Sequence, residues 1–225
     1  MATLLSLVSN IQKTINGQLL LDTALDHGNI ISTISAEDII GYLNQGVRHI
    51  ASGIIVPGLN DVTNPLPELF TLGSVTTGTD SYVALPDNYS RDLHFVANAS
   101  HVELTIYWVF SELARTYTNR TETGSLDVVA IKGSTLHYRK IPVDPEVLTI
   151  HYYRKPVDMA IDTDEPDGIP EHLHEALLCN YALIEIVKSL PNVNVSLLEL
   201  YTTWLAQAIR ELDAVTMVDR ESSFF

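Results

Sequence analysis

The apolar residues of this chain follow a helical period near both ends and an alternating period in the middle. Near the N-terminus they recur every three or four residues, which predicts a short amphipathic helix. This stripe consists of Leu4, Leu7, Val8, Ile11 and Ile15. The pair Asn16-Gly17 favours a left-handed C-cap, so we expect the first helix to end there.

A second helix is predicted to begin near Ser35, because Ser35 and Asp38 have the spacing of a capping box. Its apolar face contains Ile39, Leu43, Val47, Ile50 and Ile54. Pro57-Gly58 should end this helix. Residues 58–80 are rich in Asn, Pro, Gly and Thr, which indicates a long irregular connection with few buried contacts. Connections of this length usually have a role, and contact with a neighbouring subunit is a candidate.

The period changes to two between residues 81 and 156, which predicts a β-rich subdomain. Short strands are expected at 82–85, 93–96, 102–106, 126–131, 135–138 and 147–153. The tripeptide Lys132-Gly133-Ser134 has the composition of a hairpin turn. Residues 108–117 fit either a short helix or a continued strand.

Residues 157–218 return to the helical period. Pro170 stands where a helix should begin, because its missing N–H would be unsatisfied there in any case. The apolar residues that follow from Leu173 cover most of the circumference, which predicts a central helix. Ser196 and Glu199 predict the start of a last helix by their capping-box spacing. Residues 219–225 form a polar tail that ends in two aromatic residues.

These patterns predict an α+β protein. We expect an antiparallel helical bundle of about four helices, with a β-rich insertion between the second and third long helices. The predicted parts are N-terminal bundle helices at 1–57, a connection at 58–80, a β-rich subdomain at 81–156, C-terminal bundle helices at 157–218 and a tail at 219–225.

Composition narrows the functional classes. The chain has 225 residues, 46% of them hydrophobic, and 13 basic against 28 acidic side chains give a net charge of −15. This balance argues against a surface that neutralises nucleic-acid phosphates, and against attraction to anionic membranes. No apolar run has the length of a membrane span, and the N-terminus lacks the pattern of a signal peptide, so we expect no secretion. The single Cys179 excludes an internal disulfide and suits a reducing compartment.

Metal-ligand residue types occur near the start of the predicted central helix. These are Glu171, His172, His174 and Glu175. Helical residues two apart point to different sides, so His172 and His174 should not share one ion. We expect them to face solvent or a partner near a helix N-terminus, where the glutamates complement the helix dipole.

An acidic loop precedes this helix. Asp162, Asp164 and Asp167 before Gly168 are only superficially similar to a calcium loop, because the spacing is wrong and Pro166 intervenes. A solvated acidic loop is the expected structure. The sequence contains no nucleophile elbow, phosphate-binding glycine loop, dinucleotide fingerprint or paired cysteine motif. We therefore expect neither an enzyme nor a cofactor.

Two basic pairs, Arg139-Lys140 and Arg154-Lys155, are the densest cationic spots. They could face an acidic partner, but solvated strand ends are the favoured interpretation.

The order of the elements and several local motifs together resemble a known family. The motifs are "LPDNYSRDL", a strand "TIHYYRKP", an acidic loop "TDEPDGIPE" and a helix "HLHEALLCNYAL". They are similar to those of the head-to-tail adaptor proteins of tailed bacteriophages, over roughly residues 35–212. The resemblance implies a virion protein, made in the host cytoplasm, that forms a ring of about twelve copies beneath the portal protein. Such a ring extends the DNA channel and docks the next neck or tail component.

The resemblance also implies sites. Adaptor C-termini often reach into the portal, which makes Arg220, Phe224 and Phe225 the expected portal-docking residues. Contacts to other subunits or partners are expected at Arg154, Lys155, Asp162, Asp164 and Glu171. A ring of about twelve copies would carry a charge of about −180, so double-stranded DNA should pass through it without specific binding.

Two other functions fit the sequence less well. One is a neck or tail-completion protein that binds lower in the tail assembly without touching the portal. The other is a metal-dependent hydrolase that uses Glu171, His172, His174 and Glu175.

Overall fold

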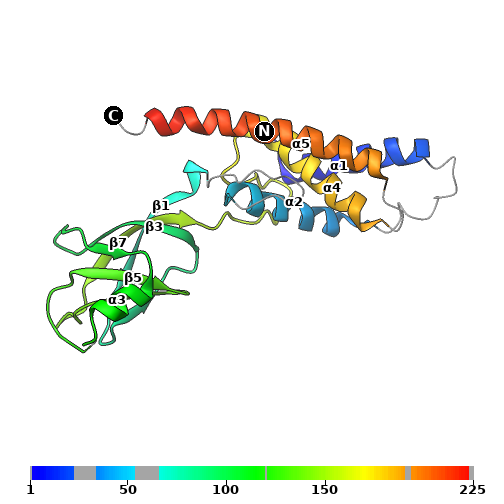
Figure 1. Ribbon diagram of the computed structural model, residues 1–225. Helices are drawn as coiled ribbons and strands as arrows, with labels where there is room; N and C mark the ends of the chain where they lie inside the picture. Colours follow the sequence, from blue (N-terminus) through cyan, green and yellow to red (C-terminus); the bar gives the residue numbers. More distant parts are fainter. Residues whose placement is uncertain (1, 23–33, 54–65, 120, 191–193, 223–225) are drawn as a thin grey trace. The chain divides into compact units, whose positions relative to one another are not determined.

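The computed structural model describes residues 2–22, 34–53, 66–119, 121–190 and 194–222 (Figure 1). The chain divides into two compact units. We call residues 1–69 with 156–225 the helical unit, and residues 70–155 the β unit. The predicted α+β class is confirmed, whereas the antiparallel four-helix arrangement stays a prediction.

The helical unit contains α1 (Leu4–Asp22), α2 (Ala36–Ala51), α4 (Asn180–Ser189) and α5 (Val195–Ser222). Helix α4 packs against both α2 and α5, and α1 contacts α2 (Figure 1). Short turns of 3₁₀-helix lie at Pro67–Leu69 and Glu171–Leu173, and a π-helical turn occupies Glu175–Cys179. The core of this unit includes Leu4, Leu7, Ile11, Ile39, Leu43, Val47, Ile50, Leu177, Leu178, Tyr181, Leu205 and Ile209.

Helix α2 begins as predicted and approaches α4 closely. The Ser35 hydroxyl accepts a hydrogen bond from the Asp38 N–H, and the Asp38 carboxylate accepts one from the Ser35 N–H, at 3.1 and 2.9 Å. Gly46 lies where α2 meets α4, and an added Cβ there would stand 3.0 Å from the Tyr181 ring. The sequence pattern therefore places the start of α2 correctly, and a glycine permits its contact with α4.

Several helix boundaries differ from the predictions. Helix α1 does not end at Asn16-Gly17 but continues to Asp22. An interior glycine costs only about 1 kcal/mol, and the residues that follow Gly17 are good helix formers. Helix α2 ends at Ala51 rather than at Pro57-Gly58, because Gly53 adopts a left-handed φ of 66° just beyond it. Ile54, Pro57 and Gly58 lie outside the described residues.

The start of α5 also differs. Ser196 lies inside the helix, and the cap is Asn194, whose side-chain oxygen accepts a hydrogen bond from the Leu197 N–H at 3.2 Å. Asn is as good an N-cap as Ser, so the capping-box spacing of Ser196 and Glu199 was misleading here.

The β unit contains two sheets. One has the order β1-β7-β3 and the other β2-β6-β5-β4. The strands are β1 (Phe70–Thr76), β2 (Tyr82–Ala84), β3 (Tyr89–Ala97), β4 (Thr105–Tyr107), β5 (Val128–Lys132), β6 (Thr135–Tyr138) and β7 (Val147–Arg154). Strands β4 and β5 pair in parallel, and the other pairs within the two sheets are antiparallel. Buried residues from both sheets form one core, among them Val96, Val129, Leu136, Leu148 and Ile150.

Local predictions in the β unit have mixed outcomes. The hairpin is confirmed, because β5 and β6 pair around Gly133, which has a φ of 60°. Of the two structures considered for 108–117, the helix is correct, and α3 spans Phe110–Thr116. Strand β1 lies inside the range predicted as an irregular connection. The usual alternation is missing, because the apolar Phe70 and Leu72 are exposed and the alternate, less exposed positions include Gly73, which has no side chain.

Candidate interaction surfaces

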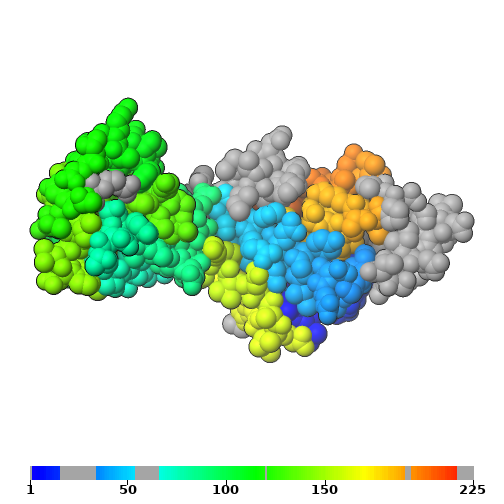
Figure 2. Space-filling model, turned by 90° about the horizontal axis from the view of Figure 1, so that it is seen from below, coloured from blue at the N-terminus to red at the C-terminus, as the bar shows by residue number. Residues whose placement is uncertain are grey.

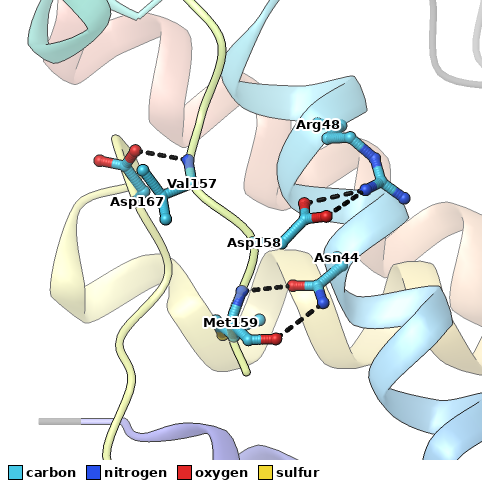
Figure 3. A network of polar contacts seen from close by, with 6 residues as sticks. All are labelled: Asn44, Arg48, Val157, Asp158, Met159 and Asp167. Carbon is cyan, nitrogen blue, oxygen red and sulfur yellow. Dashed lines mark hydrogen bonds and ion pairs between the residues drawn. The ribbon is translucent and has the colours of Figure 1, made fainter. Parts of the chain in front are cut away.

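An extended segment, residues 156–170, leads from the last strand to the helices, and we call it the strap. A buried side chain of α2 fixes it: Asn44 donates to the Met159 carbonyl oxygen at 2.9 Å and accepts from the Met159 N–H at 2.8 Å (Figure 3). One turn further along α2, an Arg48 nitrogen lies 2.8 and 2.6 Å from the two Asp158 carboxylate oxygens. The strap is thus held at consecutive residues although it has no regular secondary structure.

The acidic residues of the strap also stabilise its turns. The Asp167 carboxylate accepts a hydrogen bond from the Val157 N–H at 2.8 Å (Figure 3). The Asp164 carboxylate accepts from the N–H groups of Ala160 and Ile161, at 2.6 and 2.9 Å. These two donors lower the pKa of Asp164. The loop predicted to be simply solvated therefore contains carboxylates that fix the main chain.

The strap also supports the start of α1. The carbonyl oxygens of Asp164 and Asp162 accept hydrogen bonds from the N–H groups of Leu4 and Leu5, at 2.8 and 3.2 Å. These N–H groups have no partner within the helix, so another segment must satisfy them. The strap thus holds the first turn of α1 through these two hydrogen bonds.

The outer side of the strap remains accessible. Val157 and Ile161 expose 66% and 62% of their surface, and Asp162 and Glu165 of the same segment are exposed as well. Pro156, Met159, Pro166 and Ile169 are buried and anchor the other side. The strap therefore presents apolar and acidic side chains on a fixed main chain. We call Val157, Ile161, Asp162 and Glu165 the strap surface.

The predicted histidine cluster is divided between the interior and the surface. His174 is only 2% exposed, and its Nε2 lies 2.7 Å from the Ile169 carbonyl oxygen. The prediction that it faces solvent or a partner is wrong, because the 3₁₀ and π turns change the helical phase between Leu173 and Asn180. His172, Glu171 and Glu175 are exposed, and Glu175 accepts a hydrogen bond from Asn10 at 3.0 Å. Among the described residues, no group of three or more His, Cys, Asp or Glu could hold a metal ion.

An open groove of about 690 Å³ runs between α1, the π turn and α5. His172, Glu175, Cys179, Tyr201 and Trp204 are among its lining residues. Burial raises the pKa of the Cys179 thiol to about 12, so this cysteine is not a nucleophile at neutral pH.

The two basic pairs of the β unit have internal contacts. Arg139 lies 3.3 Å from Glu122 and 3.5 Å from Asp127, and stacks 4.0 Å above the Tyr117 ring. Lys155 donates to the Asp87 carbonyl oxygen at 3.0 Å, and Arg154 to the Lys155 carbonyl oxygen at 3.3 Å. Their role as partner contacts stays a prediction.

An exposed apolar surface that was not predicted from the sequence lies at one end of the sheet formed by β2, β6, β5 and β4. Trp108 and Val109 follow β4 and are 73% and 51% exposed. The Lys132 ammonium lies 5.0 Å from the centre of the Phe110 ring. Arg115 is exposed on α3. We call Trp108, Val109, Phe110, Arg115 and Lys132 the tip surface; only its unusual apolar run from Tyr107 to Phe110 signals it in the sequence.

Charge is divided unequally between the units. The helical unit carries 19 acidic and 5 basic side chains, a net charge of −14, whereas the β unit carries 9 and 8, a net charge of −1. Figure 2 shows part of the acidic strap at the surface, next to α2. Nearly all of the acidic excess therefore belongs to one unit.

The expected portal-docking residues are not described in detail. Phe224 and Phe225 lie outside the described residues, and Arg220 belongs to α5, where its backbone alone is described.

Comparison with known families matches residues 2–223 to the family described as SU10 adaptor protein. The match includes both units. No curated protein matches the chain. Within the described ranges, no helix is both long and apolar enough to cross a bilayer.

Proposed function

We propose that this chain, which belongs to the SU10 adaptor protein family and is therefore a bacteriophage adaptor, is a structural component of the virion neck. It assembles as a ring of about twelve copies beneath the portal protein and extends the channel through which DNA passes. The ring also docks the next neck or tail component. The observation that carries this proposal is the family match over residues 2–223.

The chemistry of the surface supports association rather than catalysis. The exposed groups of the strap and tip surfaces are apolar side chains with charges beside them, which is the composition of protein interfaces. Packed elements hold both surfaces in place, and a surface that is fixed before its partner binds loses less conformational entropy on binding. Duplex DNA would not bind tightly to a chain with a net charge of −15.

The test is to measure the assembly state with and without the portal protein of the same virus. Native mass spectrometry and electron microscopy should detect a closed ring, alone or on the portal. A chain that remains monomeric under both conditions would contradict the proposal. Deletion of residues 219–225 should abolish portal binding without unfolding the helical unit. If the truncated chain still binds the portal normally, the docking role of Arg220, Phe224 and Phe225 is wrong.

A further inference from the structure

We propose that the strap surface of one copy binds the tip surface of another copy. This inference rests on the proposed function, because it identifies the surfaces that join neighbouring subunits in the ring. The two surfaces lie on different units of the chain. A contact between them is heterologous, and repeating such a contact gives a ring when the rotation from one copy to the next closes.

The tip surface has the composition of an interface centre. Trp108 exposes 73% of its surface, the largest exposed fraction among the aromatic residues that the structure describes as exposed. Tyr107 pairs with Ala130 in the parallel ladder of β4 and β5, so the residues after Tyr107 and the last residues of β5 lie at the same end of the sheet. This arrangement brings Trp108 and Val109 to the same end of the sheet as Lys132. Tryptophan and arginine are enriched among the residues that dominate binding energy at interfaces.

The strap surface is complementary to the tip surface in both apolar area and charge. Val157 and Ile161 offer apolar area, and Asp162 and Glu165 offer negative charge. The strap, residues 156–170, has five acidic side chains and no basic one, whereas the tip surface has two cations, Arg115 and Lys132, and no acidic side chain. Their net charges are therefore −5 and +2. The apolar groups would supply most of the affinity, and the charges would set orientation and select the partner.

The contacts beneath the strap explain why this segment can serve as a binding surface. Asn44, Arg48 and Asp167 hold it through hydrogen bonds (Figure 3). Val157 and Ile161 take no part in these bonds through their side chains and are exposed. A segment without helix or strand would otherwise lose conformational entropy on binding. A second copy is the occupant that we infer, because every copy carries both complementary surfaces.

Charge reversal tests this contact. Arg115→Glu with Lys132→Glu reverses the tip, and Asp162→Lys with Glu165→Lys reverses the strap. Each pair should weaken subunit association by about tenfold or more, and the two combined should restore it to within about threefold of the wild type. Glu103→Lys with Asp144→Lys is the matched control, because both side chains are exposed in the β unit and lie outside both surfaces. Association is measured by native mass spectrometry over a dilution series, with the portal protein added if the ring needs it.

A crosslink provides an independent measurement. A Val109→Cys preparation is mixed with an Ile161→Cys preparation under mild oxidation, and we expect a disulfide between the two introduced thiols, identified by peptide mass spectrometry. Burial raises the pKa of Cys179 to about 12, which disfavours its thiolate, and peptide mass spectrometry distinguishes any disulfide of Cys179 from the expected one. Rings that form normally with either charge reversal and give no mixed disulfide would overturn the inference and leave the proposed function intact. A chain that forms no ring at all, with or without portal, would overturn both.

Discussion

Asn44 holds the strap to α2, and its replacement by alanine should release this part of the helical unit. The side chain is 8% exposed and makes two hydrogen bonds to the main chain of Met159, at 2.9 and 2.8 Å. Alanine removes both bonds and leaves the Met159 N–H and carbonyl oxygen without a partner in a buried place.

The structure sets the expected size of the effect. Each neutral hydrogen bond contributes about 1 kcal/mol net, and a buried group left unpaired adds a desolvation cost of similar size, so the total is about 2–4 kcal/mol. With a urea dependence of about 2 kcal/mol per M, the unfolding midpoint should fall by about 1–2 M.

Tryptophan fluorescence can follow the helical unit separately. The chain has two tryptophans, Trp108 in the β unit and Trp204 on α5, so a Trp108→Phe background leaves Trp204 as the reporter. Urea unfolding is then compared for Asn44→Ala and for Asn10→Ala, which removes an exposed hydrogen bond to Glu175. The control should change stability by no more than about 0.5 kcal/mol. If both variants show the same small effect, Asn44 does not anchor the strap.

Three further predictions follow from single contacts. Gly46→Ala should destabilise the helical unit by about 1–3 kcal/mol in urea unfolding, because the added Cβ would lie 3.0 Å from the Tyr181 ring. Gly41→Ala on the same helix has no neighbour within 4 Å of its Cβ and should stabilise the unit by about 0.5–1 kcal/mol. Folding lowers the pKa of Asp164, so Asp164→Asn should be destabilising at pH 7. The difference in unfolding free energy between this variant and the wild type, measured in urea, should shrink as the pH falls below about 4. A difference that does not change with pH would contradict this prediction. Cys179 should resist iodoacetamide at pH 8 in the folded chain and react in urea, because burial in the folded chain raises the pKa of its thiol to about 12. Mass spectrometry measures the labelling, and equal labelling in both states would show that the thiol is accessible.

The sequence predicts elements best where a local signal is unambiguous. The capping box at Ser35 and the turn at Gly133 each depend on a few neighbouring residues, and both are confirmed. The helix boundaries at Gly17 and at Ser196 were wrong because each has a competing local signal. A strong run of helix formers follows the glycine, and Asn194 stands two residues before the serine. Local propensities of similar strength cannot be ranked without the packing.

The candidate surfaces are harder to predict, because they depend on which side of an irregular segment is buried. The strap is recognisable as acidic in the sequence, but Asp162 and Asp164 have different roles there. The side chain of Asp164 stabilises a turn, whereas that of Asp162 is exposed. The position of His174 could not be predicted either, since a π turn changes the periodicity on which its expected face depended.

Local charge decides whether acidic copies of this chain can meet. Copies with a net charge of −15 repel one another, but at physiological ionic strength the Debye length is about 8 Å, so distant charges matter little once two surfaces are in contact. What matters is the composition of the contact itself. The helical unit carries almost the whole acidic excess, so a contact between two helical units would bring like charges together. A contact between the strap and the nearly neutral β unit avoids this repulsion, because the cations of the tip surface face the acidic strap there.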